Sequence, residues 1–126
     1  MDLGLRGRAC VVTGASRGIG RATARMLCEE GADVLLVART EDHLVEAAGG
    51  RAESFAADIT DPDAAEGIVA DATGRLGQLD VLVNNAGTAR WRDLDDVPDE
   101  DWYAAWELNV MAPMRLMRAA VPGMRE

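Results

Sequence analysis

A cluster of glycines near the start of the chain separates an apolar run at residues 9–12 from a stretch with helical periodicity. The glycines are Gly14, Gly18 and Gly20. The run before them is typical of a buried strand, and the spacing after them indicates a helix. A helix N-terminus offers unpaired N–H groups and a partial positive charge to an anion, and glycine lets a backbone approach a ligand closely. The stretch therefore predicts a strand, a turn and a helix arranged to hold a phosphate.

The spacing of these glycines, G-x-x-x-G-x-G, differs from the G-x-G-x-x-G pattern of many dinucleotide sites. Taken alone, such a turn is also compatible with a tight strand-to-helix connection that binds nothing. Other features of the chain have to decide between the two.

Length and charge narrow the possibilities. The 126 residues suffice for one domain with a hydrophobic core, but they are too few for a complete six-stranded doubly wound sheet. A net charge of −9 argues against nucleic acid and anionic membranes as partners. Residues 1–8 lack the apolar core of a signal peptide, and no apolar run reaches membrane-spanning length, so we expect a cytoplasmic protein. Cys10 and Cys28 have no metal-ligand spacing and are expected to be buried free thiols.

Strand and helix patterns alternate along the chain. Strands are predicted at residues 8–13, 32–38, 53–57 and 80–84, and helices at 17–30, 40–48, 61–76 and from 98 toward the end. Asp61 is expected to cap the third of these helices, with Pro62 at its first position. This alternation predicts an α/β fold with a parallel sheet in the order 3-2-1-4 and helices on both faces.

Four short motifs follow one another in a recognisable order: TGASRGIG at residues 13–20, Ala57-Asp58, NNAG at 84–87 and LNV at 108–110. In order and spacing they resemble the N-terminal portion of the short-chain dehydrogenase/reductase family. The similarity extends from Leu5 to Arg125. It implies a truncated Rossmann-type sheet of about four strands, a single incomplete NADP-binding domain over residues 1–126. It also implies an oxidoreductase that transfers hydride between a nicotinamide cofactor and a small carbonyl or alcohol substrate.

The resemblance assigns cofactor contacts to residues after each strand. They are Gly14, Ser16, Arg17, Gly18, Ile19, Gly20, Arg39, Thr40, Asp58, Ile59, Asn85, Ala86 and Gly87. It places Asp58 at the adenine ring, whose amino group suits a carboxylate acceptor. Residues 85–87 are placed near the ribose. From the residues alone, a turn or cap role is the alternative for Asp58, and an Asn-type turn is the alternative for residues 85–87.

The end of the second strand indicates which cofactor is preferred. NAD-binding relatives carry an acid there to bond the ribose 2′-hydroxyl, whereas this chain has Ala38 followed by Arg39. Together with Arg17, that arginine could bracket a 2′-phosphate, which a carboxylate would repel. The pattern therefore favours NADP(H) over NAD(H), although two solvated surface charges would give the same sequence.

Catalytic residues are only partly present. Asn109 matches the asparagine of the family's Asn-Ser-Tyr-Lys tetrad; a polar residue bonding at a helix kink near Pro113 is the alternative. All thirteen basic residues are arginine, and the only tyrosine, Tyr103, has Glu107 four positions later. A Tyr-x-x-x-Lys pair, in which the cation favours the phenolate, is thus absent from the sequence.

We therefore expect a cofactor-binding part that does not turn over alone, either a fragment or one half of a split enzyme. A non-catalytic nucleotide-binding or oligomerisation module is the alternative. The predicted fourth strand lacks a neighbour on one side, so its edge needs cover. The resemblance implies a homo-oligomer formed through the last two helices, or a second chain that carries the C-terminal half.

Overall fold

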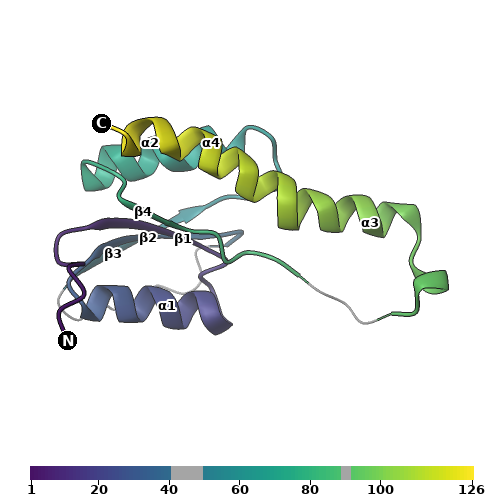
Figure 1. Ribbon diagram of the computed structural model, residues 1–126, viewed down its shortest axis with the longest axis horizontal. Helices are drawn as coiled ribbons and strands as arrows, with labels where there is room; N and C mark the ends of the chain where they lie inside the picture. The colour runs from purple at the N-terminus through teal and green to yellow at the C-terminus, as the bar shows by residue number, and fades with distance from the viewer. Residues whose placement is uncertain (41–49, 89–91) are drawn as a thin grey trace.

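A parallel sheet flanked by helices forms the body of the molecule. The computed structural model of the chain describes residues 1–40, 50–88 and 92–126. The strands are β1 (Ala9–Thr13), β2 (Asp33–Ala38), β3 (Arg51–Ala56) and β4 (Val81–Val83). All pair in parallel, in the order β3-β2-β1-β4, which confirms the predicted topology. Helix α1 (Gly18–Glu29) covers one face of the sheet, and α2 (Ala64–Leu76) and α4 (Ala112–Met124) cover the other (Figure 1).

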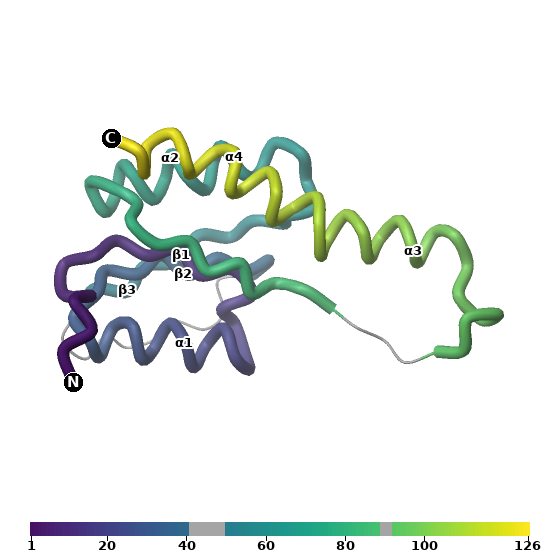
Figure 2. The backbone as a smooth tube through the Cα atoms, viewed as in Figure 1, coloured from purple at the N-terminus to yellow at the C-terminus, as the bar shows by residue number. Residues whose placement is uncertain are grey.

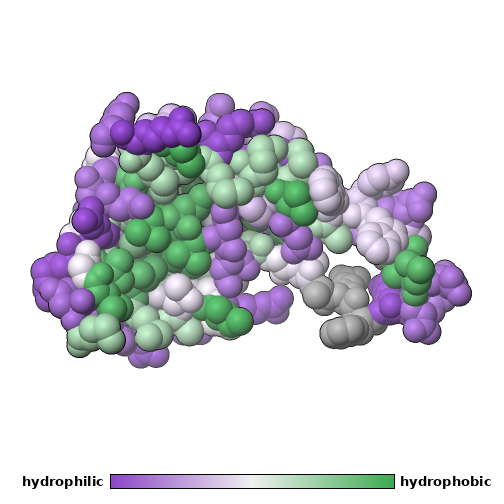
Figure 3. Space-filling view, in the orientation of Figure 1, coloured by the Kyte–Doolittle hydropathy of each residue, from purple (hydrophilic) through white to green (hydrophobic). Residues whose placement is uncertain are grey.

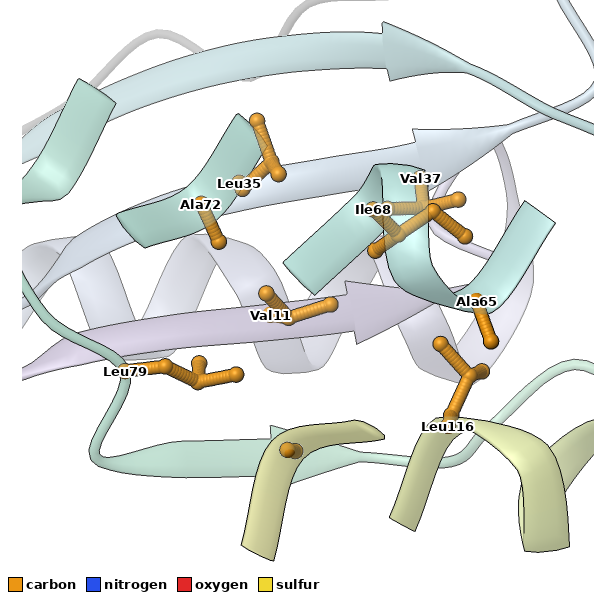
Figure 4. Close-up of a cluster of buried hydrophobic side chains, with 9 residues drawn as sticks. Val11, Leu35, Val37, Ala65, Ile68, Ala72, Leu79 and Leu116 are labelled. Atoms are coloured by element: carbon orange, nitrogen blue, oxygen red, sulfur yellow. The ribbon is translucent and has the colours of Figure 1, made fainter. Parts of the chain in front are cut away.

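The two faces of the sheet carry separate apolar clusters because side chains alternate along a strand. Val12 and Val34 pack with Cys28 on the α1 side. On the other side, residues of β1 and β2 meet side chains from α2 and α4, as Figure 4 shows for Val11, Leu35, Val37, Ile68 and Leu116. Strand β1 is buried along its whole length, and so is the middle of β2. Their apolar runs reflect burial on both faces.

The strand register brings several turns to one edge of the sheet. Thr13 pairs with Val37, and Val12 pairs with Val83. Because all strands are parallel, the segments that follow β1, β2, β3 and β4 leave from this same C-terminal edge. Ligands of open α/β sheets bind at this edge, where crossovers to opposite faces leave a crevice.

Some predicted boundaries were wrong by a few residues. Strand β3 begins at Arg51, two residues early, and β4 is limited to Val81–Val83. Helix α2 begins at Ala64, and the carboxylate of Asp61 instead accepts the amide of Asp63 (3.0 Å) in the turn before it. That hydrogen bond gives Asp61 a capping role one turn ahead of the helix. Residues 41–49 of the helix expected at 40–48 lie outside the described residues.

The last quarter of the chain is a helical arm with an irregular centre. After a short 3-10 turn (Leu94–Asp96), helix α3 (Asp99–Trp106) runs into a π turn (Glu107–Met111) and then into α4. Figure 2 shows α3 extending beyond the sheet, whereas α4 lies beside α2. No helix within the described parts of the chain has both the length and the apolar character needed to cross a bilayer.

Candidate cofactor site at the C-terminal edge of the sheet

A buried threonine ties the ends of β1 and β4 together. The hydroxyl of Thr13, which is 1% exposed, accepts the amides of Asn85 and Ala86, each at 3.1 Å. It also lies 3.4 Å from the carbonyl oxygen of Val83, to which it donates. In return, the side-chain amide of Asn85 donates to the carbonyls of Thr13 (3.2 Å) and Gly14 (3.1 Å). The glycine turn and the segment after β4 are therefore one hydrogen-bonded unit.

Two of the three glycines are required by this unit. A Cβ on Gly14, whose φ is +63°, would lie 2.9 Å from the Cα of Ala86 and 2.9 Å from the Asn85 amide nitrogen. A Cβ on Gly20 would collide with the carbonyl of Gly14 and with the same amide nitrogen. The structure thus gives Gly14 and Gly20 a reason that the sequence argument did not include, because the chain's own atoms occupy the space that a Cβ would take. That these glycines also let a ligand approach stays a prediction.

Gly18 differs from the other two because it faces open space. Its φ is +60°, and a Cβ built on it would meet nothing within 4 Å. It begins α1, after Arg17 at the N-cap, which makes no side-chain cap hydrogen bond to the described residues. The first turn also contains no acidic residue, and Ile19 is 78% exposed. The first N–H groups of a helix have no acceptor within it, so the start of α1, exposed at Arg17, Gly18 and Ile19, fits an anion such as a phosphate.

The predicted residues after β2 and β3 lie at the same edge. Arg39 and Thr40 are exposed, whereas Ser16 in the glycine turn is half-buried. Ile59 is also half-buried and packs against the cluster beneath α2, so at least part of its side chain serves the core.

Asp58 forms a local turn of its own. Its Oδ1 accepts the hydroxyl of Thr60 at 2.6 Å and the amide of Thr60 at 3.0 Å. These hydrogen bonds, with a smaller contribution from the charge of Arg39, hold the pKa of the Asp58 carboxyl below its ordinary value of 3.8. Asp58 therefore has the turn role that the sequence offered as an alternative, and the assignment of its carboxylate to adenine stays a prediction. Both hydrogen bonds use Oδ1.

Asn109 connects the π turn to the segment after β4. Its Nδ2 donates to the carbonyls of Ala105 (3.0 Å) and Thr88 (3.1 Å), and its Oδ1 accepts the amide of Thr88 (3.1 Å). A Cβ on Gly87 would lie only 2.7 Å from that oxygen. The Asn109 side chain is thus bonded to backbone at a helix irregularity, and Gly87 makes room for it.

Sequence reasoning did not single out Thr13 or Thr88. A polar residue at the end of an otherwise apolar buried strand was the available signal for Thr13, because a buried hydroxyl needs a partner. No local pattern marks Thr88. Cys10 and Cys28 are buried and free, as predicted.

A comparison with known protein families identifies the family of this chain. The family model described as short chain dehydrogenase matches residues 8–126. This chain belongs to the short-chain dehydrogenase family. The resemblance found in the motifs is thereby confirmed.

Individual short-chain dehydrogenases show how much of a relative this chain covers. A short chain dehydrogenase of Pseudocercospora fijiensis is 42% identical over 130 residues, which span 97% of this chain and 42% of the relative. L-sorbose reductase of Gluconobacter frateurii, complexed with NADPH and L-sorbose, superposes with a TM-score of 0.90 at 43% identity, covering 99% of this chain and 50% of the reductase. An NADH-dependent reductase, A1-R′, complexed with NAD, gives a TM-score of 0.89 at 30% identity, covering 99% and 55%. The chain thus spans about half the length of these relatives.

Proposed function

We propose that this chain binds NADP(H) at the C-terminal edge of its sheet and forms the cofactor-binding part of a carbonyl reductase or alcohol dehydrogenase. One observation carries the proposal. The first turn of α1 opens to solvent at Gly18, while the Thr13–Asn85 unit holds the surrounding backbone in place. An anion-binding turn that is rigid before the ligand arrives avoids part of the entropy of ordering it.

Each proposed contact has a physical basis in this chain. Bound NADP(H) would supply the hydride for transfer to or from a substrate carbon. The N–H groups at the start of α1 would hold the diphosphate. Asp58, with Oδ2 outside its local turn, would accept the adenine amino group, and residues 85–87 would border the ribose.

Preference for the 2′-phosphate would come from arginine. Arg39 is exposed at the end of β2 and its charge helps to lower the pKa of Asp58, which supports a position of its guanidinium near the proposed adenosine end. Arg17 is exposed at the start of α1. A planar guanidinium binds phosphate oxygens in pairs. Solved relatives include a complex with NADPH and a complex with NAD, so family membership alone does not determine which cofactor is preferred. The two arginines are the feature of this chain that favours NADP(H).

The proton for the reaction would come from another segment or another chain. The 126 residues contain no lysine, and Tyr103 is 71% exposed on α3 with Glu107 four positions later. Asn109 would be the one member of the family tetrad in this chain, holding the backbone near the nicotinamide end. We accordingly infer that these residues alone do not turn over a substrate.

Assembly is the remaining part of the proposal. Trp102 (55% exposed) and Trp106 (58% exposed) lie four residues apart on α3, with Val110 (40% exposed) four residues further along the arm. Exposed apolar stripes of this kind mark interaction surfaces. Figure 3 also shows apolar side chains gathered over the part of the molecule where β4 lies. Both features support a homo-oligomer through the last two helices, or a partner chain that covers β4.

Titration of the purified chain with NADPH and with NADH tests the proposal. We expect NADPH to bind at least about tenfold more tightly, a difference of about 1.4 kcal/mol. The intact mass, measured in parallel, shows whether a longer or co-purifying chain is present. No binding of either nucleotide at millimolar concentration would refute a cofactor site, and equal affinities would refute the preference for NADP(H).

A further inference from the structure

An ion pair spans the π turn in the helical arm. Nη1 of Arg115 donates to Oε2 of Glu107 at 2.9 Å. The Arg115 side chain is 13% exposed and that of Glu107 is 42% exposed, so one partner is largely withdrawn from water. Glu107 is the first residue of the π turn, and Arg115 lies in the first turn of α4. The pair therefore connects the two sides of the irregularity.

This pair suits a π turn and does not suit a regular helix. In an α-helix each residue adds a rotation of about 100° around the helix axis. The side chains of residues eight apart therefore point in directions about 80° apart. In the π turn, the amide of Ala112 donates to the carbonyl of Glu107, five residues back, which inserts one residue into the turn. Glu107 and Arg115 then have the angular separation of residues seven apart in a regular α-helix, so their side chains point in directions only about 20° apart around the helix axis. Helical side chains lean toward the N-terminus, which directs Arg115 back toward Glu107.

Asn109 lies inside the same turn and depends on its geometry. Its three hydrogen bonds reach Ala105 on one side and Thr88 across the gap to the segment after β4. Loss of the inserted residue would rotate the two sides of the arm relative to each other by about 100°. The side chain of Asn109 would then no longer face Thr88 while α4 kept its packing against the sheet.

We propose that Glu107 and Arg115 are positioning residues, whose ion pair selects the π turn and thereby holds Asn109 against residues 87 and 88. Neither residue touches the proposed cofactor edge. The consequence for cofactor affinity rests on the proposed function, whereas the coupling between the ion pair and Thr88 does not.

Hydrogen exchange followed by NMR tests the coupling. Glu107→Gln and Arg115→Met each remove the ion pair while keeping the side-chain length. We expect exchange of the Thr88 amide, the donor to Asn109, to become at least about tenfold faster in both variants, a local opening. Exchange of the Leu35 amide in the core should change less than about twofold. A role in stability alone would instead accelerate both amides together, and that result, or unchanged Thr88 exchange, would overturn the proposal.

The chain offers a matched control and a rescue. Arg92 donates to Asp101 at 2.8 Å, an ion pair of similar length at the other end of α3. Arg92→Met should leave Thr88 exchange within about twofold of wild type. The charge swap, Glu107→Arg combined with Arg115→Glu, should return the exchange rate of the Thr88 amide to within about threefold of the wild-type rate. An equal effect of Arg92→Met, or no rescue by the swap, would count against the proposed coupling.

The NADPH dissociation constant of the same variants tests the functional consequence. We expect Glu107→Gln and Arg115→Met to weaken NADPH binding several-fold, because residue 87 borders the proposed ribose site and residue 88 directly follows it. Faster Thr88 exchange with unchanged affinity would overturn the positioning role at the cofactor edge. A wild-type chain that does not bind NADPH would refute the proposed function, and the exchange measurements would still decide on the ion pair.

Discussion

Thr13 and Asn85, at the ends of β1 and β4, satisfy each other's polar groups. The Thr13 hydroxyl accepts the backbone amide of Asn85, and the Asn85 side chain donates to the carbonyl of Thr13. The two residues are 72 positions apart in the sequence. Strand β4 has only three residues, so this exchange adds to a short ladder at the point where the proposed cofactor site begins.

Replacing Thr13 by valine should destabilise the fold. Thr13→Val preserves shape but removes the acceptor of the Ala86 amide, at about 1–3 kcal/mol for a buried group. It also removes one of two acceptors of the Asn85 amide, which keeps its 3.1 Å bond to the carbonyl of Val83. Because both amides are partly buried, we expect the free energy of unfolding in urea to fall by about 2 kcal/mol. Thr73→Val is the control, since its hydroxyl bonds only to the carbonyl of Val69 within α2. That change should be below about 0.5 kcal/mol, and equal effects of the two variants would contradict the assigned role of Thr13.

Two glycine-to-alanine variants should change stability in opposite directions. A Cβ on Gly20 meets backbone of Gly14, so Gly20→Ala should lower the free energy of unfolding by about 1–3 kcal/mol or more. Gly67 is an exposed position of α2 with nothing within 4 Å of a Cβ. Gly67→Ala should raise the free energy of unfolding by about 0.5–1 kcal/mol, because alanine favours the helix. Urea denaturation of both variants measures the difference. A Gly20→Ala variant as stable as wild type would show that the glycine turn is not packed as described.

Topology could be predicted from the sequence because the decisive signals are local. Apolar runs, glycine turns and helical spacing each belong to one short segment, and parallel sheets with short connections leave few possible orders. A helix kink near Pro113 was offered by the sequence as an alternative, but the π turn and the partners of its side chains could not be predicted. Asn109 bonds to Thr88, 21 positions away, and no local propensity encodes this contact.

In the candidate site too, local sequence patterns predicted some features, and contacts between distant residues determine the others. The motif assigned Gly14 and Gly20 to cofactor contacts, which stays a prediction. The structure shows a separate requirement for both, the packing of Asn85 and Ala86 against Gly14 and of Asn85 and the Gly14 carbonyl against Gly20. The bonds of Asp58 to Thr60 show a turn that the sequence offered only as an alternative, while its assignment to adenine stays a prediction. A sequence motif records which residue types are required, whereas only the fold shows which neighbour requires them.

The buried thiol of Cys10 should make stability depend on pH in the alkaline range. Burial, with a contribution from the charge of Asp80, raises the pKa of this thiol from 9.0 to about 11. The unfolded chain loses the proton near pH 9 and the folded chain does not. Stability is therefore fully present below pH 9 and is lost as the pH rises toward 11.

We expect the loss attributable to Cys10 to be about 1–2 kcal/mol between pH 8.5 and 10.5. Urea denaturation across this range gives the slope. Cys10→Ala should show a clearly smaller decline over the same range, whatever its stability at pH 8.5. Identical slopes in the two proteins would mean that this thiol does not stay protonated in the fold.

The charge at the end of β2 should decide between the two nicotinamide cofactors. In Arg39→Asp, a carboxylate takes the place of the guanidinium that would hold the 2′-phosphate. The carboxylate repels this phosphate and can bond a ribose hydroxyl instead. We expect the NADPH dissociation constant to rise at least about tenfold and that of NADH to stay within about twofold. Arg118→Asp, the same charge change at an exposed position of α4, separates this local effect from the field of the whole molecule and should leave the ratio of the two constants unchanged. If Arg39→Asp weakens both cofactors equally, the arginine supports the fold of this edge and does not read the phosphate.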